Sequence, residues 1–319
     1  MSQIIHYLSH LSFSALFTYI IILKSLPFLK RIFPAKPTQR GMHKIIKPSS
    51  GGISFIFTYL ILVIYQGFYL PLLSFPIAVL GMIDDKYNIS KILRFVFQVL
   101  TLLSIIFYIA RDDSSFIGNI LNVNLIYIVP LIIFGATIIN SINFMDGIDG
   151  LVASCMFLII LTISIDLNLN IYFLLGALFG FIIINWNPAK VFMGDIGSNF
   201  LGYFVVVLIL ENNQIDKIIS GFLLMSPLIM DSGICLIKRI LNEENKSEIF
   251  KPHKKHLYQK MYQAGISQKK VSLMYIFTTL YLCSIYLFFY NIGILLINSL
   301  IILIGIFLLD KRYSSITNN

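Results

Sequence analysis

Long runs of apolar residues recur along the whole chain and are separated by short polar stretches. Eleven such runs can be delimited, at residues 4–23, 52–66, 68–83, 92–110, 125–142, 151–165, 171–184, 198–211, 217–237, 271–290 and 292–309. A helix needs about 20 apolar residues to cross a bilayer, so the ends of the shorter runs are approximate. The pattern predicts an all-α polytopic membrane protein with about 11 transmembrane helices in a single domain, residues 1–319.

The composition excludes two other classes of protein. Of the 319 residues, 57% are hydrophobic and only 12% are charged, whereas soluble domains are about 45–50% apolar and about a quarter charged. The many aromatic and β-branched residues also exclude a disordered chain, which is poor in both. A membrane protein is the class that remains.

The basic residues predict the orientation of the helices. With the amino terminus outside, 22 of the 24 Lys and Arg residues fall in inside segments, at residues 24–51, 84–94, 143–150, 185–197, 238–270 and 310–319. Only Arg111 and Lys217 fall outside. Because cytoplasmic loops carry an excess of Lys and Arg, this distribution predicts an outside amino terminus and a cytoplasmic carboxyl terminus. The net charge of +9 then reflects membrane topology, and no nucleic-acid partner is expected.

Neither the first run nor the cysteines indicate a secreted protein. No Lys or Arg precedes the first run, since the first basic residue is Lys24, so a cleavable signal peptide is not expected. Cys155, Cys235 and Cys283 all fall in predicted spans and match no metal-binding spacing. They are interpreted as small hydrophobic residues rather than as disulfide partners.

Five Asp residues gather at the predicted cytoplasmic surface. Asp84 and Asp85 end the third run, Asp146 and Asp149 follow the fifth, and Asp195 follows the seventh. Any one of them could simply end an apolar helix, but carboxyl-terminal helix ends disfavour negative charge because of the helix dipole. A divalent cation would compensate the charge, and carboxylates without a His or Cys set suit Mg²⁺ or Mn²⁺. The sequence therefore predicts a Mg²⁺ site on the cytoplasmic face, with Mn²⁺ as the alternative.

Basic residues surround the acidic loops on the same face. Lys44 precedes the second run, Arg94 follows the first Asp pair, and the longest cytoplasmic loop carries the segment His253-Lys-Lys-His256. Most of them are explained as anchors of the positive-inside pattern. The two histidines do not form an HExxH zinc motif, because a Lys replaces the Glu, and they are predicted to contact an anion. Acids, a divalent cation and basic groups at one membrane face together predict phosphoryl transfer from a soluble donor to a lipid.

These motifs occur in a fixed order between about residues 40 and 259. They are Arg40…His43…Pro48-Ser-Ser-Gly51-Gly52, Asp84-Asp85…Arg94…Gln98, Asn140…Asn143…Asp146-Gly-Ile-Asp149-Gly-Leu, Asn185…Pro188-Ala…Val-Phe192-Met-Gly-Asp195-Ile-Gly-Ser, Pro227…Asp231 and Pro252-His253-Lys-Lys-His256-Leu-Tyr258-Gln259. The ordered set resembles the polyprenyl-phosphate N-acetylhexosamine-1-phosphate transferases (glycosyltransferase family 4), which include the phospho-N-acetylmuramoyl-pentapeptide transferase of peptidoglycan synthesis.

The resemblance implies a reaction and its substrates. The phosphate of a polyprenyl phosphate, usually undecaprenyl phosphate, attacks the β-phosphorus of a UDP-N-acetylhexosamine. UMP leaves, and a lipid-linked sugar diphosphate remains in the bacterial cytoplasmic membrane. The implied partners are therefore undecaprenyl phosphate, a UDP-N-acetylhexosamine and the lipid bilayer, and a homodimer is among the alternatives for the oligomeric state.

The resemblance also implies roles for individual residues. Asp195 resembles the Mg²⁺ ligand, and Asp84 and Asp85 resemble the catalytic pair assigned to positioning the metal or the lipid phosphate, or to a general base. A phosphate monoester with a second pKa near ~6 needs little deprotonation at neutral pH, which favours positioning. The substrate-binding residues implied are Lys44, Arg94, Asn143, Asp146, Asp149, Asn185, Phe192, His253 and His256. Asn185, Phe192 and Asp149 match positions that hold the uridine, and the two histidines match a loop that contacts the sugar diphosphate.

The sugar and the pathway stay open. The form His-x-x-His-Leu-Tyr-Gln replaces the consecutive histidines of the peptidoglycan enzyme, so it favours the subgroup that uses N-acetylglucosamine or 6-deoxy-N-acetylhexosamines. That subgroup initiates envelope glycans such as the O-antigen of lipopolysaccharide or a wall polymer. The pentapeptide transferase is the alternative within the family.

Two other classes of protein were weighed. A transporter of lipid-linked sugars would place acids in mid-span, and the only such acid is Asp231, which is either a functional group or a structural partner of a neighbouring helix. A CDP-alcohol phosphotransferase would need Ala-Arg after its Asp-Gly motif, but Leu-Val follows Asp149-Gly150. The phosphoryl transferase is therefore the leading interpretation.

Overall fold

The computed structural model describes residues 2–37, 45–66, 69–87, 89–242 and 253–317. The α-helices are α1 (Ser2–Ile32), α2 (Ile53–Gln66), α3 (Phe75–Tyr87), α4 (Lys91–Ile109), α5 (Phe116–Val123), α6 (Ile128–Met145), α7 (Leu151–Asp166), α8 (Tyr172–Asn185), α9 (Gly194–Leu210), α10 (Ile215–Leu224), α11 (Ser226–Asn242), α12 (Leu257–Gln263), α13 (Gln268–Phe289) and α14 (Ile292–Thr317). The shorter elements are the 3-10 helices η1 (Leu70–Ser74) and η2 (Leu125–Tyr127) and the strands β1 (Pro34–Ala35) and β2 (Lys47–Pro48).

The helical class predicted from the apolar runs is confirmed. Each of the eleven runs overlaps a helix, whereas α5 and α12 lie outside them. Of the helices described, α1, α4, α6 with η2, α13 and α14 are each long and apolar enough to cross a bilayer alone. Helices α2, α7, α8 and α9 are apolar but shorter, at 10–17 residues. The chain is a multi-pass membrane protein, and the number of eleven spans stays a prediction.

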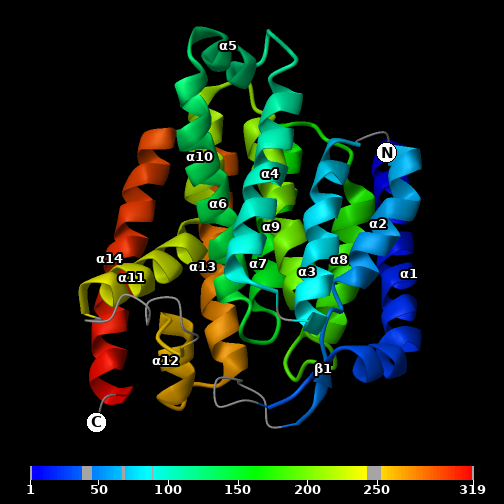
Figure 1. Ribbon diagram of the computed structural model, residues 1–319, viewed down its shortest axis with the longest axis vertical. Helices are drawn as coiled ribbons and strands as arrows, with labels where there is room; N and C mark the ends of the chain where they lie inside the picture. The colour runs from blue at the N-terminus through cyan, green and yellow to red at the C-terminus, as the bar shows by residue number, and fades with distance from the viewer. Residues whose placement is uncertain (1, 38–44, 67–68, 88, 243–252, 318–319) are drawn as a thin grey trace.

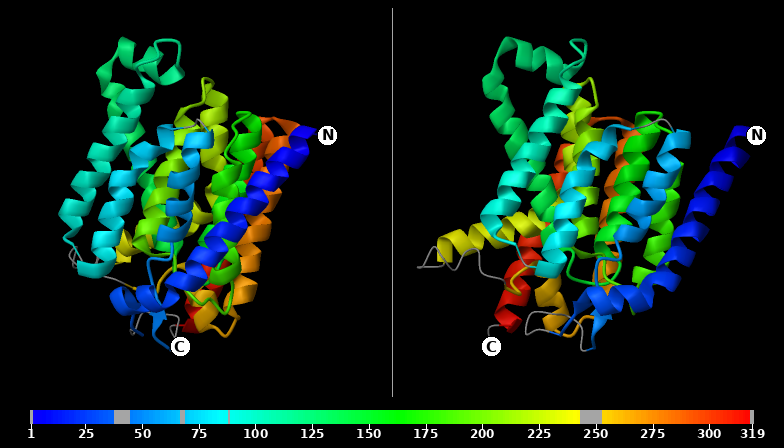
Figure 2. Two further views of the ribbon diagram at one scale, coloured as in Figure 1. Left: turned by 90° about the vertical axis from the view of Figure 1, so that its right-hand side faces the viewer. Right: turned by 45° about the vertical axis from the view of Figure 1, so that its right-hand side comes forward.

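The run at residues 217–237 is not the single straight span that its apolar pattern predicts. The chain forms two helices here, α10 and α11, with a bend of 69° between them. Pro227 is the second residue of α11. A proline has no N–H to donate and its ring clashes with the preceding turn, so α10 cannot continue through it, although proline fits the first turn of a new helix. As a result, α11 turns away from the bundle axis (Figures 1 and 2).

Helix α9 forms the centre of the bundle. All its residues from Ile196 to Leu210 are buried, and it packs against α3, α6 and α7 (Figure 1). On the outer helices, by contrast, large apolar side chains remain exposed, with Ile92 of α4 at 78% and Phe288 of α13 at 83%. An apolar outer surface of this kind suits lipid rather than water.

Small residues bring the first helix close to the bundle. Helix α1 packs along α8 at Gly176 and Gly180. A Cβ on Gly176 would lie 2.2 Å from the carbonyl oxygen of Leu11, and one on Gly180 would lie 2.2 Å from that of Ala15. Close backbone approach at small residues is typical of helix pairs in membranes.

The long connecting loops gather at one end of the bundle. The antiparallel pair of strands β1 and β2, helix α12, the loops after α6 and α8, and the carboxyl-terminal end of the chain all lie there (Figures 1 and 2). The start of α1 and helix α5 lie at the opposite end (Figure 1). We call the first of these ends the loop end, and it carries the five Asp residues predicted at the cytoplasmic surface.

Candidate active site

Three of the predicted acids meet where α3 and α9 come together. Asp84 and Asp85 lie in the last turn of α3, and Asp195 lies in the first turn of α9. One carboxylate oxygen of Asp85 accepts a hydrogen bond from the backbone N–H of Asp195 at 2.9 Å. The other accepts a hydrogen bond from the Ser50 hydroxyl at 2.6 Å. Residues 110 positions apart in the sequence are thus joined directly.

Glycines allow this close meeting. A Cβ on Gly81 of α3 would lie 2.6 Å from the carbonyl oxygen of Asp195. Gly194 has a φ of +74°, a conformation that favours glycine, and a Cβ there would lie 2.4 Å from the carboxylate of Asp85. Larger side chains at either position would push the acids of α3 away from Asp195.

Arg94 bridges the acids of the two helices. Its guanidinium lies 2.6 Å from the carboxylate of Asp84 and 3.1 Å from that of Asp195. Asp84 also accepts a hydrogen bond from the backbone N–H of Ile89 at 2.8 Å. A guanidinium presents several donors in a rigid plane, so it can hold two carboxylates at once.

Asn143, in the last turn of α6, joins this helix to the same group. Its side-chain amide donates to the carboxylate of Asp195 at 3.0 Å and lies 3.0 Å from the Ser198 hydroxyl. Its side-chain oxygen lies 3.5 Å from the guanidinium of Arg94. The predicted residues Asp84, Asp85, Arg94, Asn143 and Asp195 therefore form one connected set, which we call the acidic cluster.

Asp146 borders this cluster and is only partly buried. Burial, together with the carboxylates of Asp195, Asp85 and Asp149, raises its pKa to about 8. None of the basic side chains that the structure describes forms an ion pair with it. With this pKa and no basic partner among the described residues, the carboxyl of Asp146 is mostly protonated at neutral pH, and a cation bound beside it would favour its charged form.

Asp149 forms a second polar group beside the cluster. Its carboxylate accepts hydrogen bonds from the Asn187 amide at 3.0 Å and the Ala189 N–H at 2.9 Å, and it lies 3.7 Å from the ammonium of Lys47. The hydroxyl of Ser272 in α13 donates to its backbone carbonyl. One carboxylate oxygen of Asp149 thus holds the loop after α8 through Asn187 and Ala189.

Asn185 and Phe192 lie at the two ends of that loop. Asn185 is only 4% exposed, and its amide group bonds the Gly150 N–H at 3.1 Å and the Val191 carbonyl at 2.9 Å. Phe192 is half-buried, with the Lys47 ammonium 5.2 Å from its ring centroid. Asn185 therefore joins the two acidic loops, and direct contact of either residue with a nucleotide stays a prediction.

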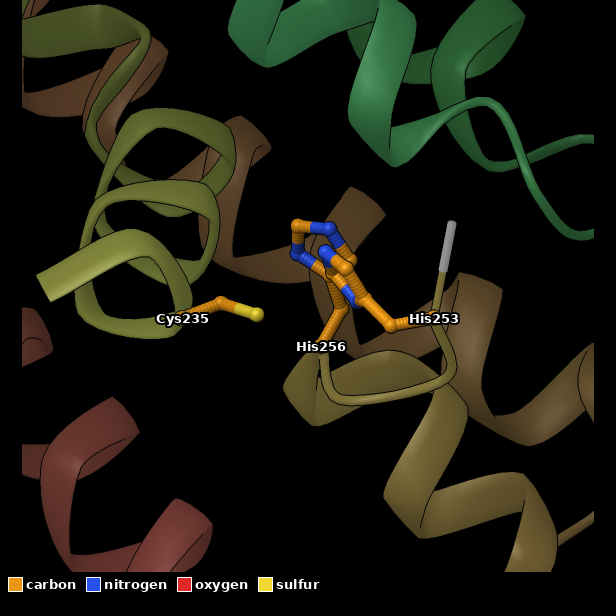
Figure 3. Close-up of side chains that lie close together, drawn as sticks. All are labelled: Cys235, His253 and His256. Carbon is orange, nitrogen blue, oxygen red and sulfur yellow. The ribbon is translucent and has the colours of Figure 1, made fainter. Parts of the chain in front are cut away.

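The two predicted histidines lie together just before α12. Their rings stack with centroids 5.1 Å apart, and His256 is 5% exposed whereas His253 is half-buried (Figure 3). The thiol of Cys235 in α11 points towards them, so that one ligand atom from each of the three residues lies within 4.8 Å of the others (Figure 3). The sequence spacing gave no indication that Cys235 joins the histidines.

One predicted site residue lies outside the described ranges, and two residues that contact the site were not predicted. Lys44 lies outside the described residues. Ser50 and Ser198 contact the acidic cluster directly but were not predicted as site residues. The only sequence signal for them is their position in the Pro48-Ser-Ser-Gly51-Gly52 and Asp195-Ile-Gly-Ser198 motifs.

The residues present fit a divalent cation. The side chain of Asp195 is 31% exposed at the edge of the cluster, next to carboxylates whose charges raise the pKa of Asp146. Carboxylate and amide oxygens, the groups offered here, are the ligands that Mg²⁺ and Mn²⁺ prefer. Asp195 would hold the ion, with Asp84 and Asp85 beside it.

Comparison with known proteins finds a family model that matches part of the chain. Residues 67–213 match the sequence model of glycosyl transferase family 4. The matched segment includes all five predicted acids together with Arg94, Asn143, Asn185 and Phe192, and it ends before the histidines.

Individual relatives extend the similarity beyond the matched segment. It is 28% identical over 306 residues to a protein of Bacillus subtilis (strain 168) named as a probable undecaprenyl-phosphate N-acetylglucosaminyl 1-phosphate transferase, covering 86% of this chain and 80% of that protein. It is 26% identical over 244 residues to the phospho-N-acetylmuramoyl-pentapeptide-transferase of Streptococcus mutans serotype c, covering 63% and 72%. It is 25% identical over 292 residues to the decaprenyl-phosphate N-acetylglucosaminephosphotransferase of Mycobacterium leprae, covering 75% and 72%.

Proposed function

We propose that this protein transfers an N-acetylhexosamine 1-phosphate from a UDP-sugar to undecaprenyl phosphate and releases UMP. The product is the lipid-linked first sugar of a cell-envelope glycan in a bacterial cytoplasmic membrane. The observation that carries the proposal is the acidic cluster, in which Arg94 bridges acids from α3 and α9 at the loop end of a membrane bundle. The relatives named for polyprenyl-phosphate sugar transfer support the same reaction.

The reaction needs two phosphates of high negative charge to approach each other. An oxygen of the lipid phosphate attacks the β-phosphorus of the donor, and the bond to the bridging oxygen of the leaving UMP breaks. Bound Mg²⁺, or Mn²⁺ in its place, would neutralise charge on the donor diphosphate. Arg94 adds a fixed positive charge between Asp84 and Asp195, where it can orient either phosphate.

Asp84 and Asp85 suit positioning better than proton abstraction. Asp84 is paired with Arg94, and Asp85 accepts hydrogen bonds from Ser50 and from the backbone of Asp195. Both oxygens of each carboxylate are thus engaged, since Asp84 also accepts from the Ile89 N–H, and this fixes the two side chains in place. The second pKa of a phosphate monoester lies near ~6, so the lipid phosphate is mostly dianionic at neutral pH and needs little deprotonation.

The remaining predicted residues would bind the rest of the donor. Phe192 and the Lys47 ammonium border the loop that Asp149 and Asn185 fix, and they offer a face and a cation to a nucleotide. His253 and His256 offer imidazoles to the sugar diphosphate. The positive-inside pattern of the basic residues supports a cytoplasmic location of this end, where soluble UDP-sugars are available.

One experiment tests the proposed activity, identifies the sugar that is transferred and distinguishes this enzyme from a pentapeptide transferase. Membranes containing the protein are offered undecaprenyl phosphate, Mg²⁺ and, in separate reactions, different donors. The donors are UDP-N-acetylglucosamine, its 6-deoxy analogues, UDP-N-acetylgalactosamine and UDP-N-acetylmuramoyl-pentapeptide. We expect UMP release with an N-acetylhexosamine donor and no release after chelation of divalent cations.

The other outcomes assign the protein elsewhere. UMP release from the pentapeptide donor alone would show a pentapeptide transferase, as the Streptococcus mutans relative is named. Movement of labelled lipid-linked sugar across the membrane without UMP formation would show a transporter. Membranes with Asp195→Asn protein at equal abundance serve as the matched control for background activity.

A further inference from the structure

Asp231 is a buried carboxylate in α11, at 2% exposure, that lies outside the acidic cluster. The sequence left open whether it is a functional group or a structural partner of a neighbouring helix. In the structure its side chain faces the start of α12 and the middle of α13. A buried carboxylate is costly unless it is hydrogen-bonded and paired, so its partners indicate why it is there.

Asp231 fixes the start of α12. One carboxylate oxygen accepts a hydrogen bond from the backbone N–H of Leu257 at 2.8 Å. The other accepts from the N–H of Tyr258 at 3.3 Å and from the hydroxyl of Tyr275 in α13 at 2.6 Å. The first N–H groups of a helix have no partner within the helix. Asp231 supplies that partner from another helix and so joins α11, α12 and α13 at one point.

The same carboxylate faces His256, the residue immediately before α12. Nδ1 of His256 lies 3.7 Å from the Asp231 carboxylate and has no hydrogen-bond partner among the described atoms. Burial lowers the pKa of His256, but the Asp231 carboxylate and the Cys235 thiol outweigh burial and raise it to about 9. His256 is therefore a buried cation at neutral pH, and His253 stacks on it (Figure 3).

Helix α12 is also tied to the loop that carries Asp146. The Tyr258 hydroxyl donates to the carbonyl of Phe144 at 3.1 Å. A Cβ on Gly147 would lie 2.1 Å from that hydroxyl, so this approach needs glycine. Phe144 and Gly147 lie on either side of Asp146 in the chain. The placement of the histidines relative to the acidic cluster therefore depends on how the start of α12 is held.

We propose that Asp231 is a positioning residue, which holds the start of α12 and the imidazole of His256 so that the two histidines meet the anionic donor. The inference rests on the proposed function, in which the histidines bind the sugar diphosphate. Asp231 itself touches no substrate and acts through His256. Loss of the carboxylate removes the partner of two helix N–H groups and the counter-charge of a buried cation in one step.

The test compares Asp231→Asn with a matched control, Asp310→Asn. Asp310 is a buried carboxylate of α14 that also holds α12, through Lys260 at 2.5 Å, and pairs with Lys238 of α11. None of its described contacts is to a histidine. Loosening of α12 alone should thus affect both variants, whereas a change at His256 should appear only in Asp231→Asn.

We measure KM for the UDP-sugar and kcat from pH 6 to pH 10 by UMP release. Asp231→Asn should raise KM roughly tenfold or more, as expected for loss of a hydrogen-bonded charge, with a smaller change in kcat. As the pH rises, Asp231→Asn should also lose activity at a lower pH than the wild type. Without the Asp231 carboxylate, burial lowers the pKa of His256, so the imidazole loses its proton earlier. Asp310→Asn should leave the pH profile in place. An Asp231→Asn enzyme with the KM and pH profile of the wild type would overturn the proposal.

A pH dependence has to account for every titratable group near His256. The groups facing it from α11, from its own loop, from α12 and from α13 are Asp231, Cys235, His253, Tyr258 and Tyr275. NMR of labelled histidine in the purified protein separates His256 from the others and needs no activity. Its pKa should fall in Asp231→Asn towards the ordinary value of about 6.5. If the pKa of His256 does not fall in Asp231→Asn, the proposal is overturned, whichever donor the enzyme uses. If the wild type releases no UMP from any donor, only the proposed function is contradicted.

Two further variants keep the proposal open to refutation. If Asp231→Asn fails to fold, His256→Gln should give the same rise in KM, and a normal KM in that variant would overturn the proposal. Cys235→Ser tests whether the thiol and the two histidines hold a soft metal ion instead. We expect its KM to stay close to that of the wild type, because serine has nearly the shape of cysteine and Asp231 keeps its contacts. Loss of activity in Cys235→Ser, together with thiolate-to-Co²⁺ absorption in the wild type, would show a metal site and overturn the proposal.

Discussion

Substitution of Gly81 by alanine tests the contact that brings the acids together. Gly81 lies one turn before Asp84 and Asp85 in α3, and its Cα faces the backbone of Asp195 in α9. A Cβ there would lie 2.6 Å from the Asp195 carbonyl oxygen and 2.7 Å from its carbonyl carbon. Both are backbone atoms, so α3 and α9 must separate to make room.

The expected magnitudes follow from this geometry. Alanine is favoured over glycine inside a helix by about 1 kcal/mol, whereas an overpacked contact costs about 1–3 kcal/mol. The net loss of stability should therefore be about 2 kcal/mol or less, and the protein should still fold. The helices must move apart by roughly half an ångström or more to reach ordinary contact, and a misplacement of about 1 Å can cost about a hundredfold in rate. We expect kcat/KM to fall by about tenfold or more.

The assay is Mg²⁺-dependent UMP release by purified protein, alongside thermal unfolding in detergent. Gly305→Ala in α14 is the matched control, because it also lies in a helix and a Cβ there would meet no atom within 4 Å. The control should keep full activity and equal or slightly higher stability. A Gly81→Ala protein with wild-type kcat/KM would refute the argument that this contact sets the geometry of the acidic cluster.

The other predictions concern the charged residues of the acidic cluster. Arg94→Lys should lower kcat/KM by roughly tenfold and Arg94→Ala by more, because one ammonium cannot hold Asp84 and Asp195 together as a guanidinium does. The control is Lys86→Ala, which removes an exposed charge beside the cluster. An equal loss of kcat/KM in Lys86→Ala and Arg94→Ala would contradict the role assigned to Arg94. Asp195→Asn should abolish Mg²⁺-dependent UMP release and weaken the binding of Mn²⁺ followed by paramagnetic resonance, whereas full activity would remove Asp195 from the site. Asp84→Asn should lose rate at every pH, because we assign Asp84 to positioning; recovery of its rate at high pH would instead indicate an obligate base.

The position of the acids shows how far the sequence reaches into the site. Asp84, Asp85 and Asp195 could be predicted because charged side chains are rare in this chain and these three lie at the ends of apolar runs on one predicted membrane surface. The role of Ser50 in holding Asp85, and that of Cys235 beside His256, could not be predicted. A serine or a cysteine near a helix gives no pattern that distinguishes a partner from an ordinary neighbour.

The sequence by itself determined the class of this protein, the approximate course of its helices and the surface that carries its acids. These properties follow from hydrophobicity and charge, which are local and can be followed along the chain. The bend between α10 and α11 was missed because hydrophobicity alone does not show where a helix changes direction, although Pro227 is a sequence signal for a break there.

Only the tertiary structure decided which of the charged residues meet. Asp85 and the backbone of Asp195 are joined because Gly81 and Gly194 let two distant helices come into backbone contact. Asp231 reaches α12 rather than the neighbouring Lys238 of its own helix, and Lys238 pairs with Asp310 instead. Such partners depend on the packing of side chains between helices, which is a property of the whole fold and of no single segment.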